Sequence, residues 1–264
     1  MARADRKSRL RFGNWIRARI LLTHLAVGTG LVATGLLFSD PLVRGLIWAA
    51  AAVPLGIGVF LTYLFTAFAE SGGGMQRRLW TLVLDRTAWN GQGEALDVGT
   101  GQGALAVGLA MRFPTARVVG MDLWAADWAY SMAACEANAR AAGVADRVRF
   151  ERASAATLPV ADGSMDLVVS HFVFHEVKDG GGPLGALKEA VRVLRPGGFL
   201  CVQDMFLDRR LYGDVQTLLR TLEDWGLKDV RFSRLADLIR IPWGMGGRRV
   251  LGAAGLITAV KRAD

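Results

Sequence analysis

The hydrophobic pattern divides the chain into two parts at about residue 70. Residues 20–39 form a run of 20 positions without a formal charge, and residues 45–69 form a second run of 25. A helix of about 20 residues covers the roughly 30 Å hydrocarbon layer of a membrane, and neither run alternates as an amphipathic helix would. We therefore predict a hairpin of two membrane-spanning helices, with its turn near residues 39–41, in preference to two buried core helices.

The remainder of the chain, residues 75–264, is typical of a globular domain in which strand-like and helix-like stretches alternate. An amphipathic helix is predicted at residues 75–89. Strands are predicted at residues 95–98, 118–122, 148–151, 165–170, 198–204, 230–233 and 255–261. Helices are predicted at residues 104–112, 127–142, 184–194 and 211–225. This alternation indicates a mainly parallel sheet that is covered by helices on both faces.

Glycine and proline mark several boundaries between these elements. We predict that Gly143 ends its helix in a left-handed conformation, and that Pro196-Gly197-Gly198 forms a turn before a strand. The Ser-Gly-Gly-Gly segment at residues 71–74 indicates a flexible linker. The predicted organisation is a basic tail, two transmembrane helices, a linker and a globular domain, at residues 1–19, 20–69, 70–74 and 75–264.

The net charge of +8 is concentrated in the first 19 residues, which hold seven basic side chains and the single acid Asp5. A basic segment directly before an apolar run is retained on the cytoplasmic side of a membrane. Arg77 and Arg78 follow the second run and agree with a return to that side. We therefore predict a protein of the cytoplasmic membrane with two spans, whose N-terminus and globular domain are cytoplasmic. The first run is too long for a cleaved signal peptide and lacks a cleavage-site pattern.

Composition excludes some classes of partner and site. Without its tail the chain carries little net charge and shows no basic groove lined with aromatic residues, so a nucleic-acid partner is not expected. Cys135 and Cys201 are 66 positions apart, a spacing typical of neither a disulfide framework nor a metal site. We predict that both are reduced and buried, and that the chain holds no metal.

The most informative motif runs from Glu94 to Gly103, from the first predicted strand into the following helix. Glycine at positions 99, 101 and 103 lets the backbone turn sharply and approach a ligand closely. The motif is not a phosphate-binding loop, because no Gly-Lys-Ser/Thr follows, and its third glycine is one position early for a dinucleotide loop. Asp122 ends the next strand, where a carboxylate can accept hydrogen bonds from both hydroxyls of a ribose. Together these features indicate an adenosine ligand.

With these motifs, residues 75–264 resemble the class I S-adenosylmethionine-dependent methyltransferases. The matching stretches are residues 94–103, 119–122, 153–159, 164–170 and 194–198. The resemblance implies an α/β fold with a doubly wound, mainly parallel, seven-stranded Rossmann-like sheet, here preceded by the transmembrane hairpin. It also implies S-adenosylmethionine as the cofactor.

The resemblance further implies roles for single residues in holding that cofactor. They are Asp97 and the backbone of Gly99, Thr100, Gly101 and Gly103 for the methionine portion, Asp122 for the ribose, Leu123 for one face of the adenine, Ser154 and Ala155 for the adenine edge, and Ser170 beside the methionine end. Ser154 departs from the family, which commonly has an acid there. A hydroxyl can still accept the hydrogen bond of the adenine amino group, so we expect weaker binding rather than none.

Methyl transfer is an in-line displacement that depends mainly on positioning and on the exclusion of water. A general base is needed only for an acceptor that arrives protonated. Candidate catalytic residues are His171 and His175, which would share one face if their segment is helical, and Asp204 at the end of a later strand. The competing interpretation is that His175 and Glu176 only fix a turn. Trp124 and Trp128 could form a wall of the adenine pocket, or be ordinary core or surface aromatics.

The leading hypothesis is a membrane-anchored methyltransferase that acts on a small or lipophilic acceptor, because a tether raises the concentration of the enzyme near a molecule dissolved in the membrane. One alternative is a membrane-bound aminopropyl transferase, although the acidic loop and paired aspartates of that class are not found. Another is a sensor or scaffold that binds the cofactor without catalysis. The sequence does not indicate the acceptor atom or the oligomeric state.

Overall fold

The computed structural model describes residues 10–69, 73–125, 130–247 and 250–263. It separates the chain into two compact units, one of residues 13–79 and one that combines the N-terminal segment up to Phe12 with residues 80–264. We describe each unit by itself.

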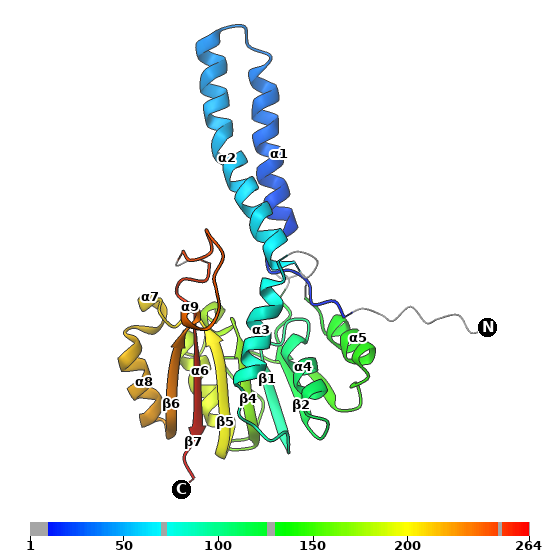
Figure 1. Ribbon diagram of the computed structural model, residues 1–264, viewed down its shortest axis with the longest axis vertical. Coiled ribbons are helices and arrows are strands. Elements are labelled where there is room, and N and C mark those ends of the chain that lie inside the picture. Colours follow the sequence, from blue (N-terminus) through cyan, green and yellow to red (C-terminus); the bar gives the residue numbers. More distant parts are fainter. Residues whose placement is uncertain (1–9, 70–72, 126–129, 248–249, 264) are drawn as a thin grey trace, which may run out of the picture. The chain divides into compact units, whose positions relative to one another are not determined.

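The first unit contains two antiparallel helices, α1 (Ala18–Gly35) and α2 (Pro41–Phe68) (Figure 1). Helix α2 begins four residues before the predicted start because Asp40 caps it: one carboxylate oxygen accepts hydrogen bonds from the backbone N–H groups of Leu42 and Val43 at 2.8 and 3.0 Å. Pro41 occupies the first position, where its missing N–H costs nothing. The charged break between the apolar runs is therefore a helix cap.

Both helices are long and apolar enough to cross a membrane, judged by length and composition. Most of their side chains are exposed, including Leu22 at 60% and Leu42 at 72%. The buried positions among the described residues are few: Leu21, Gly28 and Gly35 in α1, and Ala51, Gly58, Leu64 and Phe68 in α2. A core helix of a soluble protein buries a whole face, so this exposure favours the membrane interpretation.

Glycines allow the two helices to pack closely. A Cβ atom at Gly28 would lie 2.5 Å from Leu55 Cγ, and one at Gly58 would lie 2.6 Å from Leu25 Cδ2. The Trp48 indole Nε1 donates a hydrogen bond to the Val32 carbonyl at 3.1 Å, which ties the helices together near their turn. This arrangement of small residues at a helix contact is typical of membrane hairpins.

The second unit is built on a sheet of seven strands with the order β3-β2-β1-β4-β5-β7-β6 (Figure 1). All neighbours are parallel except β7, which is antiparallel to both β5 and β6. The strands are β1 (Glu94–Val98), β2 (Arg117–Asp122), β3 (Val148–Arg152), β4 (Met165–His171), β5 (Leu194–Asp204), β6 (Leu227–Arg234) and β7 (Gly255–Lys261). The prediction of a mainly parallel, seven-stranded sheet is confirmed.

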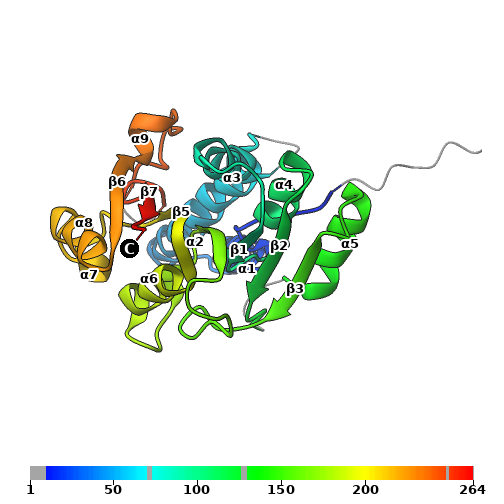
Figure 2. The same cartoon turned by 90° about the horizontal axis from the view of Figure 1, so that it is seen from below.

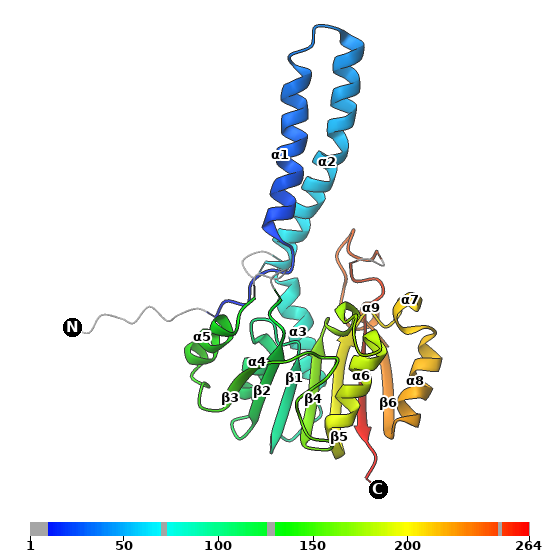
Figure 3. The same cartoon turned by 180° about the vertical axis from the view of Figure 1, so that it is seen from behind.

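Helices cover both faces of this sheet (Figure 2). The α-helices are α3 (Met75–Arg86), α4 (Ala104–Arg112), α5 (Met132–Ala142), α6 (Gly182–Val193), α7 (Arg209–Tyr212), α8 (Val215–Asp224) and α9 (Leu235–Leu238), and a single 3-10 turn, η1, spans Phe174–Glu176. One core packs α3, α4 and α5 against the sheet, and the other packs α6 and α8 against its opposite face. Figure 3 shows α6 lying over the sheet at β5.

Three predicted boundaries differ from the structure for local reasons. The predicted helix 211–225 is divided into α7 and α8 by Gly213, whose φ of 70° ends the first, and by Asp214, whose carboxylate caps the second. The helix predicted at 127–142 begins at Met132 because Ser131 caps it, and residues 126–129 lie outside the described part of the chain. Gly143 ends that helix at φ 71°, as predicted.

The third difference concerns Pro196-Gly197-Gly198. Strand β5 already begins at Leu194, which pairs with Met165, and the next pair is Phe199 with Leu167. Four residues of β5 therefore lie opposite a single residue of β4, and the predicted turn is an irregularity inside the strand.

The glycine contacts in the hairpin generate a test. Gly28→Val should destabilise the packing of α1 on α2 by about 1–3 kcal/mol, because the added atoms overlap Leu55. Gly30→Val in the same helix is the matched control, since a Cβ atom there meets nothing within 4 Å. The midpoint of helix separation during a titration of mild-detergent micelles with SDS measures both. Equal midpoints for the two variants would contradict the close contact.

Candidate functional site

The glycine loop connects β1 with α4 at the carboxyl edge of the sheet. Gly99, Gly101 and Gly103 have φ values of 73°, 59° and 81°, in the left-handed region that disfavours other residues. A Cβ atom at Gly99 would overlap the side chain of Val173, from the segment after β4. The loop thus turns sharply and lies directly against the segment that follows β4.

Asp97 is a buried carboxylate at the base of this loop. Its side chain is 1% exposed, and its Oδ2 accepts hydrogen bonds from Thr100 Oγ1 at 2.7 Å and from the Ala106 N–H at 3.0 Å. Burial raises the pKa of Asp97 to about 7, although these two hydrogen bonds lower it. A positively charged group brought close to Asp97 would stabilise its ionised form.

Asp122 joins the end of β2 to the glycine loop. One carboxylate oxygen accepts a hydrogen bond from the Gly101 N–H at 2.9 Å, and the other accepts one from the Trp124 N–H at 2.7 Å. Each oxygen of a carboxylate can accept more than one hydrogen bond, so capacity is left for hydroxyl donors. Asp97 and Asp122 lie at the ends of neighbouring strands, paired in register through Val98 and Met121.

The Gly101 peptide is held on both sides. Its carbonyl accepts hydrogen bonds from Trp124 Nε1 at 2.8 Å and from the Cys135 thiol at 3.2 Å. The ring of Tyr130 lies against the same glycine, 3.6 Å from the position of a Cβ atom. Trp124 therefore stabilises the glycine loop and is not a simple core residue. Its backbone adopts a φ of 44° in this arrangement. Trp128, the other predicted aromatic wall, lies outside the described residues.

The cysteines agree with the sequence prediction, since both are free thiols and buried. Burial raises the pKa of Cys135 and of Cys201 to about 12, so both are protonated at neutral pH. The sequence indicated no role for Cys135, because its contact with Gly101 bridges 34 positions.

A buried amide connects the glycine loop with the N-terminal segment of the same unit. Asn138 in α5 is 4% exposed. Its side chain accepts from the Arg11 N–H at 2.8 Å, and donates to the carbonyls of Arg11 at 2.8 Å and Gln102 at 3.0 Å. Phe12 packs edge-on against Trp80, with ring centroids 5.7 Å apart. Sequence reasoning did not find this contact.

The predicted adenine-side residues lie on the segments after β2 and β3. Leu123 is half exposed directly after Asp122. Ser154 forms an isolated bridge with Thr157, and its hydroxyl accepts from the Ala156 N–H at 3.2 Å. Ala155 packs partly buried against the core that contains α6.

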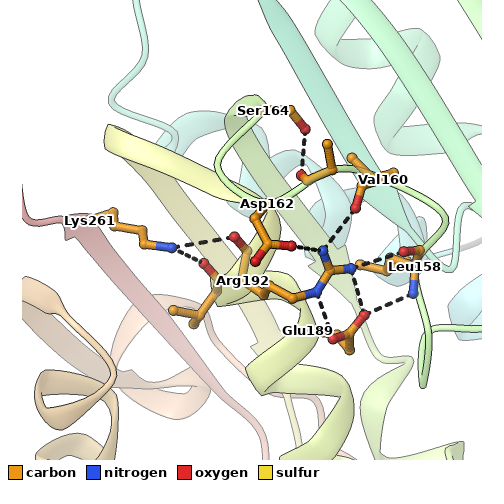
Figure 4. Close-up of polar contacts among 9 residues, drawn as sticks. Leu158, Val160, Asp162, Ser164, Glu189, Arg192 and Lys261 are labelled. Carbon is orange, nitrogen blue, oxygen red and sulfur yellow. Dashed lines mark hydrogen bonds and ion pairs between the residues drawn. The ribbon is translucent and has the colours of Figure 1, made fainter.

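Arg192 of α6 fastens the segment that continues from Ser154 (Figure 4). Its guanidinium donates to the carbonyls of Leu158 and Val160, both at 2.9 Å. It also pairs with Glu189 at 2.8 Å, and Glu189 in turn accepts from the Leu158 N–H at 3.0 Å. This clamp holds the polypeptide beyond the predicted adenine edge against α6.

Ser170 and His171 end β4 beside the glycine loop. The Ser170 hydroxyl is fully buried and donates to the Val98 carbonyl at 2.8 Å, so it joins β4 to β1. The ring nitrogens of His171 are also buried, and burial lowers the pKa of His171 to about 3, which makes the ring neutral at physiological pH. His171 belongs to β4 and His175 to η1, so the two do not share the face of one helix.

His175 and Asp204 form a close pair at this edge. His175 Nδ1 lies 2.7 Å from Asp204 Oδ1, and Asp204 is fully buried. Glu176 lies 3.5 Å from the other ring nitrogen. Burial alone would lower the pKa of His175, but the hydrogen bonds and charges of Asp204 and Glu176 outweigh it and raise the pKa to about 10. His175 is therefore a cation in this arrangement, and a base only at high pH. Tyr212, which sequence reasoning missed, is buried near Asp204 and packs on Phe206.

Most of the residues described at this edge of the sheet fall within a part of the chain that matches a known protein family. Residues 96–202 match the family of the methyltransferase domain. This part of the chain is similar to the domains of that family. It contains the glycine loop, Asp122, the segment after β3 and His175, whereas Asp204 lies two residues beyond the match.

Similar proteins have several acceptors. This chain is 44% identical over 108 residues to a demethylmenaquinone methyltransferase of Thermus thermophilus, with 40% of this chain and 44% of that protein covered. It is 34% identical to a ubiquinone/menaquinone biosynthesis C-methyltransferase of Syntrophotalea carbinolica (49% and 51% covered) and to an arsenite methyltransferase of Aquipseudomonas alcaligenes (47% and 36%). The chain spans about half or less of the length of these relatives.

Solved structures agree with the fold. The geranyl diphosphate C-methyltransferase of Streptomyces coelicolor, in complex with S-adenosyl-L-homocysteine, superposes with a TM-score of 0.54 at 18% identity, over 70% of this chain and 79% of that one. At this identity the likeness shows the fold alone. Together with the family match, the comparisons support S-adenosylmethionine as the cofactor.

The geometry of this chain fits that cofactor. The glycine loop offers close backbone approach, Asp122 keeps acceptor capacity, and the buried Asp97 can be compensated by an ammonium group. Among the described residues, no group of three or more His, Cys, Asp or Glu side chains could hold a metal ion.

The buried Asp97 predicts a pH dependence of stability. Its pKa is about 7 in the fold against 3.8 for the exposed group. Between these values the folded state binds more protons than the unfolded state, so the protein loses stability as the pH rises and the loss is complete above about pH 7. Asp97→Asn keeps an acceptor for Thr100 and Ala106 but cannot ionise.

We therefore expect the thermal midpoint of the ligand-free protein to fall between about pH 5 and pH 8 more in the wild type than in Asp97→Asn. Asp146→Asn, at an exposed position, is the matched control and should follow the wild type. Parallel pH curves for wild type and Asp97→Asn would contradict a buried, titrating carboxylate.

Proposed function

We propose that the chain is a membrane-anchored, S-adenosylmethionine-dependent methyltransferase of the cytoplasmic membrane, with its N-terminus and catalytic domain in the cytoplasm. The observation that carries the proposal is the glycine loop between two strand-end carboxylates, Asp97 and Asp122, inside a matched methyltransferase domain. The two apolar helices support the anchor.

In this proposal the loop and its neighbours hold the cofactor. Asp97 faces the methionine portion with the backbone of residues 99–103, and Asp122 accepts hydrogen bonds from the ribose. Leu123 covers one face of the adenine, and Ser154 with Ala155 borders its edge. Ser170 contributes by fixing β4 against β1 beside the methionine end, since its hydroxyl is bonded to the Val98 carbonyl.

Bound S-adenosylmethionine would supply a methyl group on a positively charged sulfur, ready for in-line attack. The domain contributes orientation, and orientation of reactants can supply about 7–11 kcal/mol of the barrier. In this proposal His175, held by Asp204, donates a hydrogen bond to an oxygen of the acceptor and does not remove a proton at neutral pH; its pairing with Asp204 and its raised pKa support this role. The neutral His171, whose ring nitrogens are buried, lines the same edge and shapes it without adding charge.

The acceptor we propose is small or lipophilic and dissolved in the membrane. A hairpin anchor is unnecessary for a water-soluble acceptor, but it concentrates the domain near a molecule confined to the bilayer. Two of the similar proteins are named for the methylation of quinones, and one solved relative is named for an isoprenoid diphosphate. These names agree with the acceptor class and do not identify the molecule.

The decisive experiment incubates the detergent-purified full chain with methyl-labelled S-adenosylmethionine and a total lipid and metabolite extract. We expect label in the lipid fraction and release of S-adenosylhomocysteine. A parallel incubation with decarboxylated S-adenosylmethionine tests an aminopropyl transferase. Cofactor binding without turnover of any acceptor would indicate a sensor or scaffold and contradict the proposed reaction.

Removal of the Asp122 carboxylate should abolish cofactor binding and leave membrane insertion intact. Asp122→Ala loses the acceptors for the ribose and for the Gly101 and Trp124 N–H groups. Isothermal titration calorimetry measures the affinity, and alkaline carbonate extraction measures insertion. Asp146→Ala, at an exposed position, serves as the control. If Asp122→Ala still bound S-adenosylmethionine with micromolar affinity, the assignment of Asp122 to the ribose would be wrong.

The charge state of His175 predicts the pH profile of kcat/KM. If the imidazolium is the active form, the rate is level from about pH 7 to pH 9 and falls near pH 10, whereas a neutral base would give a rate that rises about tenfold per pH unit below its pKa. Asp204→Asn should move the fall to lower pH, because it removes the negative charge that stabilises the cation. A rate that climbs steadily up to pH 10 would assign the base role instead.

A further inference from the structure

The segment between α9 and β7, residues 239–254, exposes a large aromatic side chain at the edge of the sheet that carries the site. Trp243 is 89% exposed, the highest fraction among the exposed large apolar side chains of the described residues. The segment leads into Gly255, which pairs with Asp204 at the carboxyl end of β5 (Figure 1). Trp243 therefore belongs to the same edge as the His175–Asp204 pair.

This segment is packed onto the domain through one side and exposes its other side. Met245 is fully buried and Leu251 is 2% exposed, and the Leu251 N–H donates to the Met245 carbonyl at 3.0 Å. The carbonyl of Ala253 accepts from the Leu207 N–H at 2.9 Å, which fastens the segment beyond β5. The fold thus buries two apolar side chains that follow Trp243 in the sequence, whereas Trp243 itself is largely exposed.

The charge of the segment is entirely basic. From Leu238 to Val260 the sequence contains Arg240, Arg248 and Arg249 and no acidic residue. Arg240, three positions before Trp243, is exposed. An exposed tryptophan with arginines and no acid is the composition of an interface with an anionic lipid surface, where basic side chains are attracted to the lipid phosphates.

A short stretch of chain connects the globular unit with the apolar helices. Arg11 is bonded to Asn138 beside the glycine loop, and only residues 13–17 separate Phe12 from the start of α1. An extended chain of this length covers at most about 20 Å. The connection between Phe12, which belongs to the globular unit, and α1 is therefore short.

We propose that residues 239–247 form a second, peripheral membrane contact in which Trp243 enters the headgroup region of an anionic bilayer and Arg240 binds lipid phosphates. The inference rests on the membrane-spanning part of the proposed function and goes beyond its chemistry. The proposed contact would hold the carboxyl edge of the sheet at the membrane, so that a membrane-dissolved acceptor reaches His175 without crossing bulk water.

The test uses the full chain in vesicles and a polarity-sensitive thiol dye. Trp243→Cys carries the dye in one variant, and Met111→Cys carries it in the matched control, because Met111 is 55% exposed near the end of α4, at the opposite edge of the sheet. Cys135 and Cys201 are buried, which confines labelling to the introduced thiol. Vesicles of phosphatidylcholine are compared with vesicles that also contain phosphatidylglycerol.

We expect the dye at position 243 to shift to the blue, to be quenched by brominated lipids and to lose quenching by aqueous iodide, most strongly with phosphatidylglycerol. The dye at position 111 should keep its iodide quenching. Adding Arg240→Gln to the Trp243→Cys chain should reduce the increment that the anionic lipid produces. Equal iodide quenching at the two positions overturns the proposed contact.

Alkaline carbonate extraction separates this result from failure of the anchor. If the chain stays in the membrane pellet while the dye at position 243 remains exposed, the contact is wrong and the spanning helices stand. If the chain is released, both the anchor and the contact are overturned. The methyltransferase assignment is independent of either outcome, because it is measured by turnover.

Discussion

A buried carboxylate at the end of β1 is the constraint around which the site is organised. Asp97 is almost fully buried, and its only described donors are Thr100 Oγ1 and the Ala106 N–H, both from the chain immediately after it. To bring these donors back over the strand end, the backbone must turn through three left-handed glycines. The same turn exposes peptide groups to a ligand. One backbone turn therefore both satisfies the buried carboxylate of Asp97 and gives the cofactor loop its shape.

The loop is stabilised from outside itself as well. Asp122, Trp124 and Cys135 all bond the Gly101 peptide, and they come from the end of β2, the segment after it and α5. Arg192 performs a similar task for the segment after β3 by bonding two of its carbonyls. A site that acts mainly by orientation needs such supports, because a small displacement of bound reactants reduces the rate strongly.

The features that could be predicted from the sequence are those set by residues close together along the chain. The predicted bounds 104–112 and 255–261 coincide with α4 and β7, where apolar periodicity and flanking glycines agree. Asp97, the glycines and Asp122 were found because strand ends and turns are local signals. Trp124, Cys135 and Asn138 were not assigned these contacts, since each reaches a loop residue 23 to 36 positions away. The division of helix 211–225 had a local signal in Gly213 and Asp214 that the apolar pattern outweighed.

The amide of Asn138 has a consequence for any attempt to obtain the globular unit without its apolar helices. A chain shortened to begin after α2 lacks Arg11, and with it the backbone donor and acceptor that satisfy this side chain. A buried polar group left without its partners costs about 1–3 kcal/mol. The bond to the Gln102 carbonyl would then be the sole described hydrogen bond of that amide. Arg11 and Phe12 are thus part of the globular unit's architecture, and a soluble version should carry their segment as a fused or added peptide.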